Sequence, residues 1–268
     1  MATPVTNMIK KLLFLILSSF ILSACQTGLS GRSQLVFMPK NEINQMGLTS
    51  FAKLKKDIPI STSKKYNRYV SCIANALINE VGGQWEVVVF NDKQLNAFAL
   101  PGYKIGIYTG LIKLVDNQSQ LAAVVGHEIM HVLAQHGNER MSQKAAVLGS
   151  VALVQAAARP ETMLGQKALG LLGVGAQYGV LMPYSRVHES EADLLGLDIM
   201  AKAGFDPKQS IILWQKMAKA SGGKTPEFLS THPSHDTRIE DLQEQMPKAL
   251  ELQRQAIAKG KVPRCDDL

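Results

Sequence analysis

Two histidines four residues apart constrain this chain more than any other feature. His127 and His131 lie within an otherwise apolar segment, residues 121–133. The apolar spacing predicts a helix over residues 117–136, with Gly137 just beyond its end, and residues four apart share one face of a helix. Burying polar groups without partners costs on the order of several kcal/mol. The two imidazoles therefore need a partner, and one shared metal ion is the simplest.

The residue after the first histidine is a glutamate, so residues 127–131 have the sequence His-Glu-Ile-Met-His. This HExxH pattern is typical of zinc sites in peptidases. Zinc lowers the pKa of a water towards neutrality, and the neighbouring carboxylate takes the proton as the water attacks a peptide carbonyl. The motif predicts one zinc ion (Zn²⁺) per chain, with His127 and His131 as ligands and Glu128 as the general base.

The third protein ligand of a catalytic zinc ion must come from elsewhere in the chain. In the metzincin pattern, a glycine at position 134 and a histidine at position 137 complete the motif. This chain has Ala134 and Gly137 instead. The metzincin pattern therefore fails, and the alternative is a carboxylate from a later helix.

Residues 187–193 contain such carboxylates. Glu189 and Asp193 are four residues apart and therefore share a helix face. Glu189 could bind zinc, while Asp193 accepts the second ring N–H of a ligand histidine, His127, and so orients the ring. Glu191 lies on a different face of the same helix and is interpreted as a solvated acidic residue.

The N-terminal residues have the features of a targeting segment. Lys10 and Lys11 precede a largely apolar run over residues 12–22, which is about half of the ~20 residues that span a bilayer. The run ends in Leu-Ser-Ala-Cys at residues 22–25, which resembles a bacterial lipobox. We predict a signal peptide over residues 1–24; the alternative is an uncleaved anchor helix.

On this interpretation Cys25 carries the lipid, and several acyl chains anchor a protein stably to a membrane. The chain then faces the periplasm of a bacterial cell envelope. Gln26, rather than an aspartate, follows the cysteine, which favours the outer over the inner membrane.

Two further cysteines and the charge limit the remaining possibilities. Cys72 and Cys265 could form a disulfide in an oxidising compartment, or they could be two unrelated thiols. The formal net charge is +7, but no cluster of lysine and arginine is interleaved with aromatic residues. We therefore expect a solvated basic surface and no nucleic-acid partner.

The rest of the chain alternates between helical and strand patterns. We expect helices at residues 41–57, 64–81, 185–203 and 207–220 and from 234 onwards, and strands at 85–90 and 104–109. The apolar residues 141–182 are interpreted as two packed helices, with a membrane-dipping hairpin as the alternative. The predicted fold class is α+β, mainly helical, with one small sheet.

The expected parts are a signal peptide (1–24), a lipidated tether with a short helix (25–60), a metallopeptidase domain (61–250) and a C-terminal tail (251–268).

Several motifs together resemble the zinc metallopeptidase family of HtpX and the CAAX prenyl proteases. HExxH is followed some 60 residues later by Glu-Ser-Glu-Ala-Asp at residues 189–193. Further similar segments, over roughly residues 65–245, are Asn96–Ala99, Ile107–Leu111, Tyr184–Arg186 and Thr231–Pro233, with Arg238 near the end. The chain is similar in particular to the small lipoprotein members of the LoiP type and to the mitochondrial inner-membrane stress protease.

The resemblance implies a gluzincin-like domain in which His127, His131 and Glu189 bind zinc and Glu128 is the base. It also implies that Asn96, Ala97, Phe98 and Ala99 form an edge strand beside the cleft, to which an extended substrate can add. From the residues alone, Phe98 and Leu100 could equally be core residues.

The remaining histidines are less constrained. The resemblance implies that His232 returns to the cleft, where it either donates to the oxyanion or acts as a fourth, blocking ligand. Taken alone, His232 is a turn histidine before a proline. His136, His188 and His235 are interpreted as surface or structural residues.

Three hypotheses follow. The first is a membrane-anchored endopeptidase that cleaves unfolded or misassembled envelope proteins, a substrate class taken from the resemblance. The second is a non-catalytic zinc lipoprotein that acts as a chaperone or assembly factor. The third is a lipoprotein scaffold without a metal. Glu128 argues against the second, because a structural zinc site has no use for a base.

The lipobox interpretation predicts the behaviour of a Cys25→Ser variant. Without the thiol, acylation and normal processing should both fail, and the precursor should be held by its signal segment. Metabolic labelling with a radioactive fatty acid measures this directly. Label that persists in the variant would contradict lipidation at Cys25.

Overall fold

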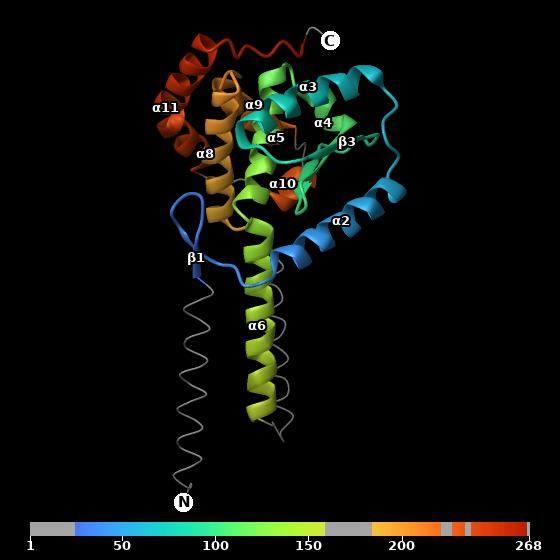
Figure 1. The fold of residues 1–268 in the computed structure, drawn as a ribbon, viewed down its shortest axis with the longest axis vertical. Helices are drawn as coiled ribbons and strands as arrows, with labels where there is room; N and C mark the ends of the chain where they lie inside the picture. Colours follow the sequence, from blue (N-terminus) through green and yellow to red (C-terminus); the bar gives the residue numbers. More distant parts are fainter. Residues whose placement is uncertain (1–24, 159–183, 221–226, 234–236, 267–268) are drawn as a thin grey trace, which may run out of the picture. The chain divides into compact units, whose positions relative to one another are not determined.

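The computed structural model describes residues 25–158, 184–220, 227–233 and 237–266. The expected signal peptide, the later part of the apolar segment 141–182 and His235 lie outside these residues. As predicted, the fold is mainly helical with small sheets (Figure 1). The described residues divide into two compact units: 25–39 with 138–158, and 40–137 with those from 184 onwards.

The first unit contains a short hairpin that the sequence patterns did not predict. Strands β1 (Cys25–Thr27) and β2 (Ser33–Leu35) pair antiparallel. The loop between them supplies Arg32, whose guanidinium donates two hydrogen bonds of 2.8 and 2.7 Å to the carboxylate of Glu139. Strands of three residues are too short to show alternation, so this segment was interpreted as an irregular tether.

Helix α6 (His136–Ala158) belongs to the first unit from Asn138 onwards. The Ser142 hydroxyl accepts the N–H of Phe37 at 3.1 Å, and the Asn138 amide donates to the carbonyl of Met38 at 3.0 Å. None of the helices in the described ranges combines the length and the apolar character that crossing a bilayer requires.

The second unit is built around a three-stranded sheet. Strands β3 (Glu86–Phe90) and β5 (Lys104–Tyr108) pair parallel, and β4 (Ala97–Leu100) pairs antiparallel with β5. The order β3-β5-β4 places β4 at an edge. The two predicted strands are therefore confirmed, and so is the edge strand that the resemblance implied.

Aromatic side chains pack the edge strand β4 against the rest of this sheet. Phe98 stacks on Phe90, with 5.9 Å between ring centroids, and meets Phe51 edge-on at 6.2 Å. The Phe98 ring lies so close over Gly106 that a Cβ there would be 2.3 Å from it. Phe98 is thus a packing residue that holds the edge strand against its neighbour.

The helices of the second unit largely have the predicted bounds: α2 (Lys40–Asp57), α3 (Lys64–Val81), α8 (Arg186–Lys202) and α9 (Lys208–Lys219). Short helices α4 (Thr109–Leu114) and α10 (Glu227–Thr231) were not predicted, and α11 runs from Arg238 to Ala258. Capping explains the sharp starts: Ser63 accepts the N–H of Tyr66, and Ser185 accepts that of His188.

The predicted end of the histidine helix is wrong. Helix α5 spans Gln118–Leu133, and Gly137 lies inside α6 rather than beyond a helix end. The break occurs because Gln135 takes the left-handed conformation, with φ 57°. This turn, which a glycine usually makes, redirects the chain so that α6 begins at His136.

Helices α5 and α8 lie side by side (Figure 1), and a pair of glycines lets their backbones approach closely. A Cβ on Gly196 would lie 2.9 Å from the backbone nitrogen of His127, and one on Gly126 would lie 3.0 Å from the carbonyl oxygen of Gly196. Real Cβ atoms rarely come so close, so glycine is required for this approach. All residues of α5 from 119 to 131 are buried, including the polar side chains of His127, Glu128 and His131.

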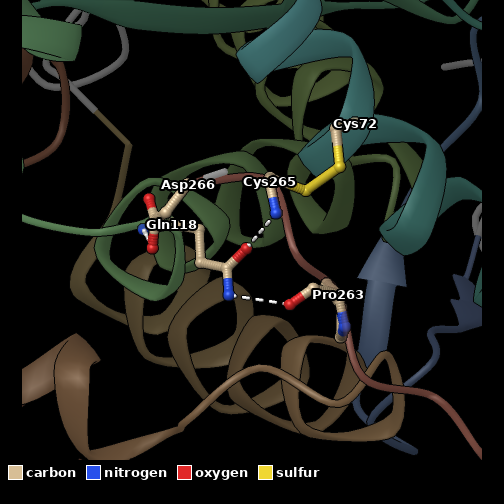
Figure 2. The surroundings of a disulfide bond; sticks show 5 residues. All are labelled: Cys72, Gln118, Pro263, Cys265 and Asp266. Carbon is tan, nitrogen blue, oxygen red and sulfur yellow. Dashed lines mark hydrogen bonds between the residues drawn. A yellow bond between two sulfur atoms is a disulfide. The ribbon is translucent and has the colours of Figure 1, made fainter. Parts of the chain in front are cut away.

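A disulfide joins Cys72 of α3 to Cys265 near the C-terminus (Figure 2). The bond closes a sequence separation of 193 residues, which the chain-entropy model values at about 5 kcal/mol. Gln118, in the first turn of α5, donates to the carbonyl of Pro263 at 2.8 Å and accepts the N–H of Cys265 at 2.6 Å. The C-terminal segment is thereby tied to the start of the histidine helix.

Candidate metal centre

Four side chains converge inside the second unit. His127 and His131 come from α5, Glu189 from α8, and His232 from the segment after α10; one ligand atom from each lies within 4.8 Å of the others. The two Nε2 atoms of His127 and His131 are 2.9 Å apart, and Glu189 Oε1 is 3.3 Å from His131 Nε2. All four residues are buried.

The remaining contacts of His127 show which atoms face the centre. Its Nδ1 lies 2.8 Å from Asp193 Oδ1. Because a carboxylate only accepts, Nδ1 carries the proton and the Nε2 lone pair faces the other ligands. The structure therefore places Asp193 where the sequence predicted it, behind His127.

The charge states of the ligand side chains favour the binding of a cation. Burial lowers the pKa of His127, but Asp193 outweighs it and raises this pKa, so the site attracts positive charge. Burial and the neighbouring His127 hold the pKa of His131 well below its ordinary value, which keeps this ring neutral. Burial raises the pKa of Glu189, but the polar contacts with His131 and His232 outweigh it and lower this pKa. Two neutral imidazole nitrogens and one carboxylate are a donor set that binds zinc well, so a metal ion fits.

A buried arginine donates hydrogen bonds to two of the carboxylates of α8. Arg238 donates from Nε to Asp193 Oδ2 at 2.5 Å and from Nη2 to Glu189 Oε2 at 2.7 Å. Its guanidinium lies 4.1 Å from the centroid of the Trp214 ring. In the sequence, Arg238 was only part of the resemblance, and nothing in its neighbourhood indicated a contact with both carboxylates.

Glu128 lies between the ligand group and the edge strand. Its Oε2 accepts the backbone N–H of Ala99 at 2.9 Å, and its Oε1 is 3.3 Å from His232 Nε2. Burial raises the pKa of Glu128, although His232 and His127 counteract it. A carboxyl with a raised pKa can both take and return a proton near neutral pH.

Of the four predicted substrate-strand residues, Ala99 donates a backbone hydrogen bond to the predicted base, Glu128. The Asn96 carbonyl accepts the N–H of Tyr108 at 3.0 Å, just before β4 begins. Ala97 is buried in the main core, and Phe98 packs against the aromatic cluster described above. The interpretation of Phe98 as a packing residue therefore applies even though the strand lies beside the centre.

Comparison with known proteins agrees with this geometry. Residues 64–246, well over half of the chain, match the model of peptidase family M48. The chain belongs to peptidase family M48. With the buried ligand group, membership of M48 supports a metalloendopeptidase.

The chain is similar to several curated proteases. It is 38% identical over 186 residues to the mitochondrial metalloendopeptidase OMA1 of Schizosaccharomyces pombe, covering 68% of this chain and 53% of that protein. It is 34% identical over 258 residues to the mitochondrial metalloendopeptidase OMA1 of Danio rerio, covering 90% and 54%. It is 30% identical over 207 residues to the beta-barrel assembly-enhancing protease of Yersinia pestis, covering 73% and 42%. The chain spans about half the length of these relatives.

One sequence interpretation at this M48 centre is wrong: Glu191 is not solvated, with 6% of its surface exposed. Of the two alternatives for His136 and His188, surface or structural, the structural one holds, since both are buried. His136 Nε2 lies 3.2 Å from Glu191 Oε2, and the rings of His136 and His188 stack with centroids 4.6 Å apart. Helix faces alone did not reveal these contacts, because the turn at residues 134–135 creates them.

The geometry predicts different roles for Glu189 and Asp193 of α8. Glu189→Ala should abolish stoichiometric metal binding, because the two α5 histidines then lack a carboxylate partner. Asp193→Asn should weaken metal binding by only about 10–100-fold, as expected of a residue behind a ligand. Elemental analysis and competition with a chelator measure both effects.

Asp198→Asn is the matched control, because Asp198 lies on the same helix but bonds Gln245 and Lys248. It should bind metal like the unaltered chain. If Asp193→Asn lost more metal than Glu189→Ala, the two assignments would be reversed.

Proposed function

We propose that this chain is a zinc metalloendopeptidase that hydrolyses peptide bonds of unfolded or misassembled proteins in a bacterial envelope. The observation that carries the proposal is the position of Glu128. Its carboxylate lies between a metal-ligand group and the N–H of an edge strand, which is where a base must meet an extended substrate. Membership of family M48 supports the same reaction.

Zinc is the proposed metal, one ion per chain, held by His127, His131 and Glu189. When bound, it would supply Lewis-acid chemistry that makes a water acidic enough to lose its proton near neutral pH. Glu128 would take that proton and deliver it to the leaving amine. Asp193 keeps the His127 lone pair directed at the centre, and burial of all these groups excludes bulk water.

Strand β4 is proposed to bind the substrate backbone. It is the edge strand of its sheet, so a peptide in extended conformation can pair with its free side. The Ala99 N–H points to that side, since it donates to Glu128 and not to β5. Main-chain pairing gives little sequence preference, which suits substrates recognised by being unfolded.

Location and subtype are proposals from the sequence together with the relatives. We propose a small lipoprotein member of the LoiP type, with residues 1–24 as signal peptide, a lipidated tether to residue 60, a catalytic domain over 61–250 and a C-terminal tail. The lipid on Cys25 would hold it at the periplasmic side, preferably on the outer membrane. The Yersinia relative, named as a beta-barrel assembly-enhancing protease, supports an envelope role, whereas the OMA1 relatives are named as mitochondrial.

One observation favours a second candidate, a non-catalytic zinc lipoprotein that acts as a chaperone or assembly factor. His232 Nδ1 lies 3.3 Å from His127 Nε2 and 3.1 Å from Glu189 Oε1, so it can complete a set of four protein ligands. Closed sets of four are typical of structural zinc. Cleavage of casein by the zinc-loaded chain separates the two candidates.

Glu128→Gln tests the proposed reaction. The amide keeps a hydrogen-bonding group beside the centre but cannot take a proton, so turnover of casein should fall by about 10²–10⁴-fold. Zinc content and thermal stability should stay near those of the unaltered chain. Cleavage at an unchanged rate would refute Glu128 as the base.

His232→Ala tests what closes the centre, and the sign of the change distinguishes two roles. If His232 acts as a fourth ligand that blocks the centre, its loss should raise basal casein cleavage. If it donates to the oxyanion, its loss should lower turnover by about 10²–10³-fold with zinc content unchanged. An unchanged rate would exclude both roles.

A further inference from the structure

The second predicted ligand, His131, also has a partner behind it. Its Nδ1 lies 2.9 Å from the Nδ1 of His136, and the Nε2 of His136 lies 3.2 Å from Glu191 Oε2. All three side chains are buried, with His136 fully inaccessible. The three groups form a line that starts at the ligand group and ends at a carboxylate.

With His136 neutral and Glu191 ionised, the hydrogen bonds along this line fit one arrangement of protons. Glu191 as a carboxylate only accepts hydrogen bonds, so the Nε2 of His136 carries a proton and donates to it. A neutral His136 then has a lone pair on Nδ1, which accepts the Nδ1–H of His131. His131 is thereby left with its lone pair on Nε2, the atom that lies 2.9 Å from His127 Nε2 in the ligand group.

Stacked rings hold the line in place. The ring of Tyr184 stacks on His131 with centroids 4.1 Å apart and planes 25° apart. The ring of His188 stacks on His136 with centroids 4.6 Å apart and planes 26° apart. Both imidazoles are thus restrained in the orientation that makes the two hydrogen bonds.

The turn after α5 is what makes the contact possible. On a continuous helix, residues five apart point about 140° away from each other. The left-handed Gln135 ends α5 and folds His136 back towards His131. Helix α8 then supplies three acidic residues with separate tasks: Glu189 in the ligand group, Asp193 behind His127 and Glu191 behind His136.

We propose that His136 and Glu191 are positioning residues that select the metal-binding tautomer of His131, as Asp193 does for His127. The inference rests on the proposed metal centre and extends it to a histidine pair. Such partners orient a ligand ring and raise its basicity, and their loss weakens metal binding by about 10–100-fold.

The test compares two substitutions of His136 in the full chain. His136→Phe keeps a ring in the stack but removes the acceptor, so His131 should lose its tautomer preference and zinc affinity should fall about 10–100-fold. His136→Asn offers an amide oxygen near the former Nδ1 and should restore affinity to within a few-fold. Affinity is measured by competition between the chain and a zinc chelator.

Nitrogen NMR of the metal-free chain, with ¹⁵N-labelled histidine, reads the tautomer without activity or metal. His131 should carry its proton on Nδ1 in the unaltered chain and in His136→Asn. A proton on Nε2 in the unaltered chain would overturn the proposal, whether or not His136→Phe folds. Equal zinc affinity in folded His136→Phe and the unaltered chain would overturn it too.

Glu191→Gln tests the far end of the line. The amide can still accept from His136 but has no charge. The zinc affinity of this variant should therefore lie between that of the unaltered chain and that of His136→Phe. Affinity equal to the unaltered chain would remove Glu191 from the proposal. If the unaltered chain binds zinc tightly but cleaves no casein, the proposed function fails while this inference stands.

Discussion

The candidate metal centre depends on how closely α5 and α8 cross. The two histidines belong to one helix and Glu189 to the other, 62 positions later in the sequence than His127. At the crossing, Gly126 and Gly196 allow backbone atoms to approach to a distance that any Cβ would prevent. A wider crossing would carry Glu189 out of reach of both imidazoles, and Asp193 out of reach of His127.

Electrostatics explains why the same region needs a cation. Glu128, Glu189 and Asp193 are buried together, and Arg238 donates to the last two. Buried charges are costly unless they are paired and hydrogen-bonded. Asp193 raises the pKa of His127, which shows that the cluster attracts positive charge. A divalent ion at the four-residue group would answer the same demand.

Packing beyond the centre holds the edge strand in place. The edge strand β4 is held from behind by the Phe98 ring, which lies over Gly106 and against Phe90 and Phe51. Its other side reaches the centre through the hydrogen bond from Ala99 to Glu128. At the opposite end of α5, Gln118 is bonded to the segment that the Cys72–Cys265 disulfide secures. Both ends of the histidine helix are therefore restrained by parts of the chain distant in sequence.

The sequence by itself determined the features that depend on local periodicity: the helices, the strands and the helix faces. Apolar periodicity and capping residues predicted the main helices and both long strands, and four-residue spacing placed His127 with His131 and Glu189 with Asp193. These predictions held because helical and strand patterns involve neighbours within a few positions.

Tertiary structure decided the rest. The left-handed Gln135 reversed the expected path after α5 and turned His136 into a neighbour of His131, which no periodicity indicates. Glu191 contacts His136, 55 positions away in the sequence. Arg238 donates to two carboxylates, 45 and 49 positions away. Hydrophobic spacing shows which face of a helix is buried, but a polar group buried on another face is paired only by what the fold brings against it.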